Sequence, residues 1–495
     1  MKKMNLLAMS LVSAAALSFS SCSSNDDLGG GAGTQSQVKG FYMTLAVQTP
    51  TSNETRTAQS NETNATAAES DVTSGTLYLV NAKGEVAFSK NISKAEWQES
   101  KIPTQGQTGK TQIQIQVEKV AAGATYKVYF LANTTDSKPW ENNIITATSK
   151  FAEPYVTANN FAMFNQNDAT VDGNGYTVVF TDANKEIKTP AQVKYNSKTS
   201  AIKIERIAAR IDEPNPASKK ITAYAGTNAT EAEKRAMEDA LKKVQGLELT
   251  RYAISNLANK SYIMQKWTDA TTLTIPSGIT YWNPAGEFGS ENKFENADRF
   301  TTATAAFAHK DYVFENNSST SPSTMYFEYK VTLKDMTGAD FPEDGTFYRY
   351  NNVIYKSFAD ILSAYKDVQG LFQGQTAEQL KTELENAKKV ETGEGAKDVE
   401  TKLADFRAKY DIEVFNEGKT YYKQVIQDQY LKKDDQLIPN VIQRNSIYQL
   451  TVNNIFNIGA QVPNGEIDKT ALFYLDVTVS VNPWVLNSQD VNLGE

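Results

Sequence analysis

Few side chains in this sequence could serve as catalytic groups or metal ligands. Its 495 residues include one cysteine, Cys22, and one histidine, His309. A histidine without a second histidine or cysteine beside it is poor material for a metal site or acid–base catalysis, and His309 is predicted to be an ordinary surface or turn residue. The glycine-rich run 29–33 lacks the lysine and the strand–helix context of a phosphate-binding loop. We therefore expect no enzyme activity, no catalytic or metal-binding residues and no cofactor.

The position of Cys22 predicts chemistry of a different kind, the attachment of a lipid. Two lysines follow the initiating methionine, an apolar run covers 6–19, and two serines stand directly before Cys22. This order is typical of an export signal, so residues 1–21 are predicted to be a signal peptide. The segment resembles a bacterial lipobox, in which the thiol is acylated, although Phe19 stands where leucine is usual. The alternative is an ordinary signal peptide followed by an incidental cysteine.

Charge and hydropathy exclude several classes of partner. The formal net charge is −8, which argues against nucleic-acid binding because phosphate contacts need a basic surface. Beyond the export signal no stretch approaches the roughly 20 apolar residues of a membrane span. Membrane attachment is therefore expected only through the lipid of the precursor. With a single cysteine there is no internal disulfide, and a chain of this length is expected to form two or more domains.

The first predicted strand covers 41–47 and stands shortly before a single basic residue. Its apolar side chains alternate with other residues at the period of a half-buried strand, and they are Phe41, Met43, Leu45 and Val47. A polar stretch over 50–74 follows and is expected to be an exposed loop. Arg56 is the only basic residue between Lys39 and Lys83, so a trypsin-like protease would cut there. The alternative is an arginine in a solvated loop with no further role.

Short strands separated by turns dominate the remaining sequence. Abundant tyrosine and threonine favour strands, and the segment Pro214-Asn215-Pro216 marks a domain boundary. This pattern predicts a mostly β protein with one β-sandwich over 57–212 and a second over 213–484. Helices are predicted at 230–244, 357–365, 376–389 and 398–409. The last three carry narrow apolar stripes and are expected to be surface insertions in the second sandwich.

Two C-terminal segments could leave the domain as extended strands. The first alternates apolar and polar residues in the same way as 41–47, through Leu475, Val477, Val479 and Val481. The second is the tail over 485–495, with the apolar residues Val485, Leu486, Val491 and Leu493. Without a further role, the first would be the last core strand and the second a frayed terminus.

Several short segments resemble the fimbrillins of Bacteroidetes type V pili, and most of all the minor-fimbrillin shaft subunit. The clearest pair is RNSIYQLTV at 444–452 with LDVTVSVNPW at 475–484. The segment ERIAAR at 205–210 is similar to the strand that ends the family's first domain, and LTRYAI at 249–254 to an early strand of its second. The order of these segments, together with the lipobox, carries the resemblance.

The resemblance implies a structural protein made of two transthyretin-like β-sandwich domains. Family members reach the outer membrane as lipoproteins, and an extracellular Arg-specific protease cuts the loop after the first strand. Loss of that strand opens a groove, which a C-terminal strand of another subunit fills. Here this implies lipidation at Cys22, a propeptide over 22–56 and cleavage at Arg56.

The resemblance also implies which segments exchange and with whom. The removable strand would hold Phe41, Met43, Leu45 and Val47. The donor would be a C-terminal strand; of the two candidates here the tail is favoured, with some or all of 472–481, including Leu475 to Val481, as the lesser possibility. The partners would be other copies of the chain and accessory tip and anchor subunits, and the mature protein would lie in an extracellular fimbria that supports adhesion.

A second hypothesis shares the lipobox and the β-sandwiches. It is a surface glycan-binding lipoprotein of a polysaccharide-uptake system, which would need no cut at Arg56. Trp140, Trp267 and Trp282 could stack on sugars, although core or loop packing is the expected role of such residues.

Overall fold

The computed structural model describes fourteen stretches of the chain. They are residues 40–48, 63–99, 101–102, 110–134, 144–148, 152–157, 160–166, 176–185, 202–269, 272–283, 300–335, 341–428, 431–463 and 475–486. Cys22, Arg56, Trp140, Val491 and Leu493 lie outside them, as do the predicted signal peptide and most of the predicted propeptide and tail. Within the described residues, no helix is long and apolar enough to cross a membrane.

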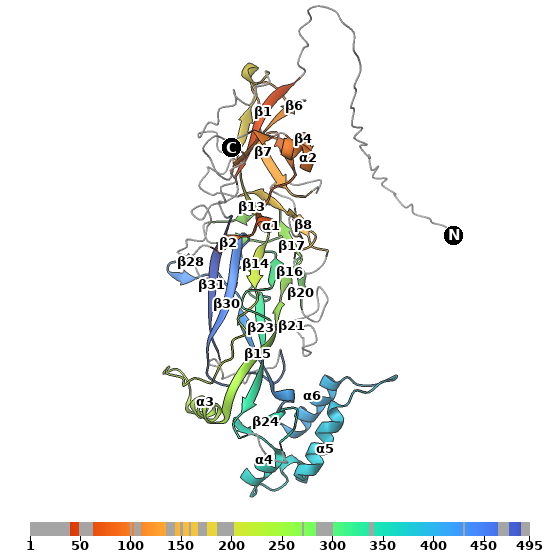
Figure 1. The fold of residues 1–495 in the computed structure, drawn as a ribbon, viewed down its shortest axis with the longest axis vertical. Coiled ribbons are helices and arrows are strands. Elements are labelled where there is room, and N and C mark those ends of the chain that lie inside the picture. The colour runs from red at the N-terminus through yellow and green to blue at the C-terminus, as the bar shows by residue number, and fades with distance from the viewer. Residues whose placement is uncertain are drawn as a thin grey trace, which may run out of the picture. The chain divides into compact units, whose positions relative to one another are not determined.

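The N-terminal region is built on one nine-stranded sheet (Figure 1). Its strands follow the order β4-β3-β7-β11-β13-β1-β6-β5, with β12 also paired to β7. Their bounds are β1 Phe41–Gln48, β3 Gly75–Val80, β4 Val86–Ile92, β5 Lys101–Ile102, β6 Lys110–Val117, β7 Thr125–Ala132, β11 Met163–Asn165, β12 Thr177–Val179 and β13 Ile202–Arg206. Helix α2 (Lys94–Glu99) places Trp97 against Phe130, with their ring centroids 5.5 Å apart.

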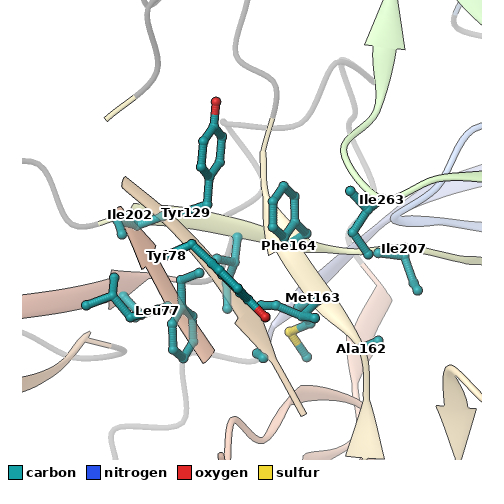
Figure 2. Packing of buried hydrophobic residues seen from close by; sticks show 14 of the residues in the cluster. Leu77, Tyr78, Tyr129, Ala162, Met163, Phe164, Ile202, Ile207 and Ile263 are labelled. Carbon is teal, nitrogen blue, oxygen red and sulfur yellow. The ribbon is translucent and has the colours of Figure 1, made fainter. Parts of the chain in front are cut away.

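A single hydrophobic core serves this sheet (Figure 2). Buried side chains from β3 and β7, such as Leu77 and Tyr129, belong to the same cluster as Met163 and Phe164 of β11 and Ile202 of β13. Met43, Leu45 and Val47 of β1, together with Ile115 and Val117 of β6, complete the cluster. Both halves of the strand order therefore share one core.

The second half of the chain forms a β-sandwich. One sheet has the order β2-β31-β30-β14-β22 and the other the order β21-β15-β23-β27. Their bounds are β2 Thr63–Ala65, β14 Ala209–Asp212, β15 Val244–Ser255, β21 Thr301–Thr302, β22 Lys310–Val313, β23 Thr324–Leu333, β27 Lys419–Val425, β30 Ser446–Ile455 and β31 Leu475–Leu486. Alternating residues of β14, β15, β23 and β30 pack into one core between the two sheets.

A helical module is inserted between strands of this sandwich. Helices α4 (Phe358–Ala364), α5 (Ala377–Lys388) and α6 (Val399–Tyr410), with the 3-10 turn η4 (Leu371–Gly374), pack beside the small sheet β25-β24-β26 (Figure 1). The strands of that sheet are β24 Phe347–Tyr350, β25 Val353–Tyr355 and β26 Glu413–Phe415. The module has its own apolar core, which includes Phe358, Leu384 and Phe406. The helices are thus inserted as expected, but they enclose a core and do not merely cover a surface.

Short pairs and helices complete the described fold. The two-stranded pairs are β8 (Ile144–Thr146) with β17 (Lys260–Tyr262), β9 (Val156–Thr157) with β10 (Asn160–Phe161), β16 (Leu257–Ala258) with β20 (Tyr281–Trp282), β18 (Lys266–Trp267) with β19 (Leu273–Thr274), and β28 (Lys432–Lys433) with β29 (Gln436–Leu437). The remaining helical segments are α1 (Ala67–Ser70), α3 (Glu231–Lys243), η2 (Asp182–Asn184) and η5 (Asn416–Gly418). Helix α3 begins with a capping box between Thr230 and Glu233.

The mostly β fold class with an inserted helical segment is confirmed by this architecture. One local expectation is refined: the segment 205–210, compared above with a single strand that ends a first domain, is divided between two strands. Strand β13 ends at Arg206 in the N-terminal sheet, and β14 begins at Ala209 in the sandwich sheet. The chain therefore crosses from one sheet to the other at Ile207 and Ala208, both of which are buried.

Candidate functional site

The first strand, β1, lies in the interior of the N-terminal sheet. It pairs antiparallel with β6 along its whole length, from Phe41↔Val117 to Gln48↔Lys110. On its other side it pairs in parallel with β13, at Val47↔Ile202 and Gln48↔Lys203. In the described pairings, β6 and β5 join the sheet only through β1. Removal of β1 would therefore leave an open slot between β13 and β6.

The side chains of β1 fill the core on one face of the strand. Met43, Leu45 and Val47 are buried, and Leu45 is only 1% exposed. Phe41 is half-buried and lies 5.4 Å from the ring of Phe180, measured between centroids. Burial of each such side chain contributes about 1.5–3 kcal/mol. The four residues expected to form a removable strand thus share one strand, and three of them are core residues.

A second short segment follows the stretch that contains Arg56. Strand β2 pairs in parallel with the end of β31, at Thr63↔Trp484, Asn64↔Val485 and Ala65↔Leu486. Helix α1 comes directly after β2 and begins with a capping interaction. The backbone N–H of Thr66 donates to Glu69 Oε2 at 2.7 Å, and the Thr66 hydroxyl donates to the same oxygen at 3.0 Å.

Glu69 is the centre of a buried polar network, which we call the Glu69 network and which comprises Glu69, Arg206, Arg210, Asp212 and Tyr312. Arg210 Nη1 donates to Glu69 Oε1 at 3.0 Å, and the hydroxyl of Tyr312 donates to that oxygen at 2.8 Å. Arg206 Nε donates to the backbone carbonyl of Glu69 at 2.8 Å. The network therefore joins α1 to β13, β14 and β22, which belong to both main sheets.

Further hydrogen bonds extend the Glu69 network toward β30. Arg210 contacts Asp212 through two bonds, Nε to Oδ1 at 2.7 Å and Nη2 to Oδ2 at 3.0 Å. Gln449 donates to Asp212 Oδ2 at 2.8 Å. Arg206 Nη1 donates at 2.9 Å to Asn445 Oδ1. Bidentate arginine–carboxylate pairs are among the strongest and most directional polar contacts in proteins.

The pKa shifts of Glu69, Arg206 and Tyr312 agree with a charged, hydrogen-bonded cluster. Burial alone would raise the pKa of Glu69. The hydrogen bond from Thr66 and the charge of Arg210 outweigh it, however, and hold that pKa below its usual range. Burial lowers the pKa of Arg206 to about 9, which leaves the guanidinium charged at neutral pH. Burial, followed by the charge of Glu69, raises the pKa of Tyr312, so its hydroxyl stays a donor.

The last described strand, β31, contains the first group of residues expected at the C-terminus and two residues of the second, Val485 and Leu486. Leu475, Val477, Val479 and Val481 stand in register with Ile455, Val452, Leu450 and Tyr448 of β30. The ladder with β30 ends at Pro483↔Ser446. Beyond it, Val485 and Leu486 are paired with β2. The strand thus extends past Trp484, into the first two residues of the expected tail.

Sequence reasoning did not single out the Glu69 network as a unit. Arg206 and Arg210 were noted only as part of a family motif, and Glu69 was not noted. A usable signal was present, because two arginines interrupt an apolar run that is otherwise suited to a buried strand. Buried charges of this kind require partners.

The remaining predicted site residues have unremarkable surroundings. His309 is exposed and contacts Asp311 Oδ1 through Nε2 at 3.0 Å. No group of three or more His, Cys, Asp or Glu side chains able to hold a metal occurs in the described ranges. Trp267 and Trp282 are half-buried.

Two parts of the chain match families of fimbrial proteins. Residues 41–206 match the family described as major fimbrial subunit protein (FimA). The matched segment begins at β1 and ends with β13. Residues 413–490 match the family described as major fimbrial subunit protein type IV, fimbrillin, C-terminal, which runs from β26 through β31. Over these two segments the chain is similar to fimbrillins, and it is called fimbrillin-like below. The two matches bound the fimbrillin-like segments, and the helices α4 to α6 lie between them.

Solved structures with related descriptions also resemble the fimbrillin-like chain. A candidate cell adhesion protein from Parabacteroides distasonis is 14% identical, with 91% of this chain and 99% of that one covered at a TM-score of 0.45. A fimbrial assembly protein from the same organism is 13% identical, with 64% and 89% covered at a TM-score of 0.28. No curated protein sequence matches the chain. The likeness to fimbrillins rests on the two sequence matches, not on these overlaps.

Proposed function

We propose that this fimbrillin-like chain is a shaft subunit that polymerises by strand exchange after proteolysis. The precursor is lipidated at Cys22 and carried to the outer membrane, and an Arg-specific extracellular protease cuts after Arg56. The cut removes the lipid together with β1, and the mature chain enters an extracellular fimbria that supports adhesion. Accessory tip and anchor subunits complete the filament.

The single observation that carries this proposal is the interior position of β1. An edge strand could leave a sheet with little consequence, but loss of β1 exposes the ladders of both β13 and β6. It also uncovers the pocket vacated by Met43, Leu45 and Val47. Such an open slot favours the addition of a strand from another chain, because main-chain pairing and apolar burial are both restored.

The donor that fills the slot comes from the C-terminus of a second copy. We favour the tail from Val485 onward, because its first residues pair only with the three-residue β2 in the described pairings. Withdrawal of the residues from Leu475 to Val481 would also break the ladder with β30. Their alternation matches β1 more closely, however, and they are the alternative donor.

Proteolysis of the purified full chain tests the proposal. Treatment with an Arg-specific protease is expected to produce high-mass ladders on gels and filaments in electron micrographs. Arg56→Gln should abolish both, whereas Lys83→Gln, which changes an exposed basic residue that such a protease ignores, should leave both intact. A cleaved wild-type chain that stays monomeric would contradict the proposal.

A truncation then identifies the donor. If residues 487–495 supply the donor, a chain that ends at Leu486 should be cut normally but should form no high-mass products on gels. Continued polymerisation would assign the donor to β31. The substitution Val479→Asp, tested beside the truncation, distinguishes the two candidate donors. A charge at this position should prevent insertion of the donor into the slot only when β31 is the donor.

A further inference from the structure

The helical module contains a crevice to which neither family match assigns a role. We call it the α6 crevice. It has a volume of about 810 Å³ and lies between α6, the β24–β25 hairpin and residues 461–462. Ligand sites in proteins commonly measure about 300–1,000 Å³. The α6 crevice is therefore large enough for a small molecule of one or two rings.

Small side chains on α6 leave room in the crevice. Ala404 and Ala408 are one helical turn apart, line the crevice and are exposed. Their neighbours Leu403 and Phe406 point into the core of the module. The face of α6 toward the crevice therefore carries only small side chains at these two positions, whereas the opposite face is packed in the core of the module.

Two arginine–glutamate pairs line the crevice. Arg349 Nη2 donates to Glu413 Oε1 at 2.6 Å, and its Nε donates to Oε2. Arg407 Nη1 donates to Glu400 Oε2 at 3.3 Å. The arginine side chains are only 3% and 8% exposed, whereas those of Glu413 and Glu400 are 32% and 30% exposed. Each carboxylate is therefore paired with a buried guanidinium group, which balances its charge, and part of each glutamate side chain stays exposed to solvent.

Amide side chains complete the rim. The hairpin between β24 and β25 turns at Asn351 and Asn352, which have φ angles of 47° and 62°. A two-residue hairpin of this type requires positive φ at both positions, which asparagine tolerates. Gln461 accepts a hydrogen bond from the backbone N–H of Val414 at 2.7 Å through its Oε1, so its Nε2 group is the donor left to a ligand.

We propose that the α6 crevice binds a neutral saccharide of one or two units. Vicinal sugar hydroxyls each donate and accept, and they need carboxylate acceptors beside amide donors. The crevice supplies both at little net charge, because two of its three carboxylates are paired. Val462 and the two alanines add apolar surface for the C–H faces of a ring.

The same lining disfavours other ligand classes. An anion would meet the edges of Glu400 and Glu413 and the carboxylate of Asp411. A cation would have to compete with two buried guanidinium groups for the same carboxylates. An apolar ligand would leave these polar groups without water, which costs about 1–3 kcal/mol for each unsatisfied group.

Binding of the uncleaved full chain to an array of neutral oligosaccharides tests the proposal. Titration calorimetry with lactose and maltose measures the affinity in solution, with glucuronate and spermidine as anionic and cationic probes. The wild-type chain is expected to bind at least one neutral array member and neither charged probe. Because no cleavage is involved, this result is independent of filament formation.

Matched variants assign the binding to the crevice. Ala404→Trp fills the recess and should weaken binding by at least about tenfold, or about 1.4 kcal/mol. Ala359→Trp makes the same change at an exposed position of α4 outside the crevice and should have no effect. Glu400→Gln should weaken binding several-fold, whereas Glu378→Gln on exposed α5 surface should not. Unchanged circular dichroism of these variants excludes unfolding.

Several outcomes would overturn the proposal. They are the absence of binding to any neutral saccharide, binding only to glucuronate or spermidine, and equal affinity in the wild type and Ala404→Trp. Loss of binding in Ala359→Trp would likewise place the site elsewhere.

Discussion

The segments on the two sides of Arg56 are held in the protein by opposite kinds of interaction. Before Arg56, β1 is held by a backbone ladder and by apolar side chains in the core of the N-terminal sheet. After it, β2 and α1 are held by three register positions with β31 and by the buried charges of the Glu69 network. The contacts of β1 require only a strand with alternating apolar residues, whereas those of β2 and α1 require particular charged side chains.

This difference indicates which segment can be exchanged. Any strand with alternating apolar residues can restore the pairing and burial of β1, since neither depends on a particular side chain. No generic strand can restore a carboxylate that meets Arg210, Tyr312 and Thr66 at once. We infer that β1 is the replaceable part of the chain, and that the segment after the cut stays with the mature subunit.

The largest expected effect comes from removal of the carboxylate at the centre of the network. Glu69→Ala should lower the free energy of unfolding by about 4 kcal/mol, because Arg210 and Tyr312 lose a buried partner. Glu96→Ala is the control, since Glu96 caps α2 through Ser93 in the same way but is 43% exposed. It should cost about 1 kcal/mol. Equal losses in denaturant titrations would show that the buried network is not what holds the segment.

A core substitution in β1 should have an effect that depends on cleavage. Leu45→Ala should cost about 3 kcal/mol in the uncut chain, because it opens a cavity in the core. After cleavage and removal of β1, the variant and the wild type should be equally stable. The Glu69→Ala loss should persist in both forms. A Leu45→Ala effect that survives cleavage would mean that β1 remains in place.

The stability of the uncut chain should fall in acid, partly through Glu69. Its folded pKa lies below the ordinary value of 4.5, so its contribution is complete above that value and is lost as the pH falls through the folded pKa. The wild type should therefore lose more stability below pH 4.5 than Glu69→Gln does. Parallel pH profiles of the two denaturation midpoints would contradict a charged Glu69.

The smallest effect is expected at the pairing of β2 with β31. Asn64→Pro disrupts this short ladder and should cost about 1 kcal/mol. Hydrogen exchange should become faster at 484–486, whereas Ser446–Ile455 should remain protected. Asn64→Gln, which keeps the backbone N–H, is the control. Unchanged exchange at 484–486 in the proline variant would show that β2 does not hold the end of β31.

Local patterns in the sequence predicted many of the elements. The alternation over 41–47 matches β1 within one residue, and the expected helix at 376–389 matches α5 within one residue at each end. Side-chain periodicity and capping residues act between neighbours in the chain, so they are visible without the fold. Cys22 and Arg56 were singled out by rarity alone and stay predictions.

The relations between distant segments could not be predicted in this way. Nothing in the residues 41–48 indicates that β13 is their parallel neighbour, or that Glu69 meets Arg206 and Arg210. The core of the helical module was also missed, because the apolar stripes of α5 and α6 are narrow and become a core only when several elements face one another.

Local sequence patterns were enough to predict many of the strands and helices, the candidate lipid and cleavage positions, and the fimbrillin-like order of motifs. The interior position of β1, the buried charges that hold the residues after β2, and the polar crevice beside α6 became visible only in the folded chain. The physical reason is range: periodicity and capping depend on adjacent residues, whereas sheet order, charge pairing and cavities depend on which distant segments come together.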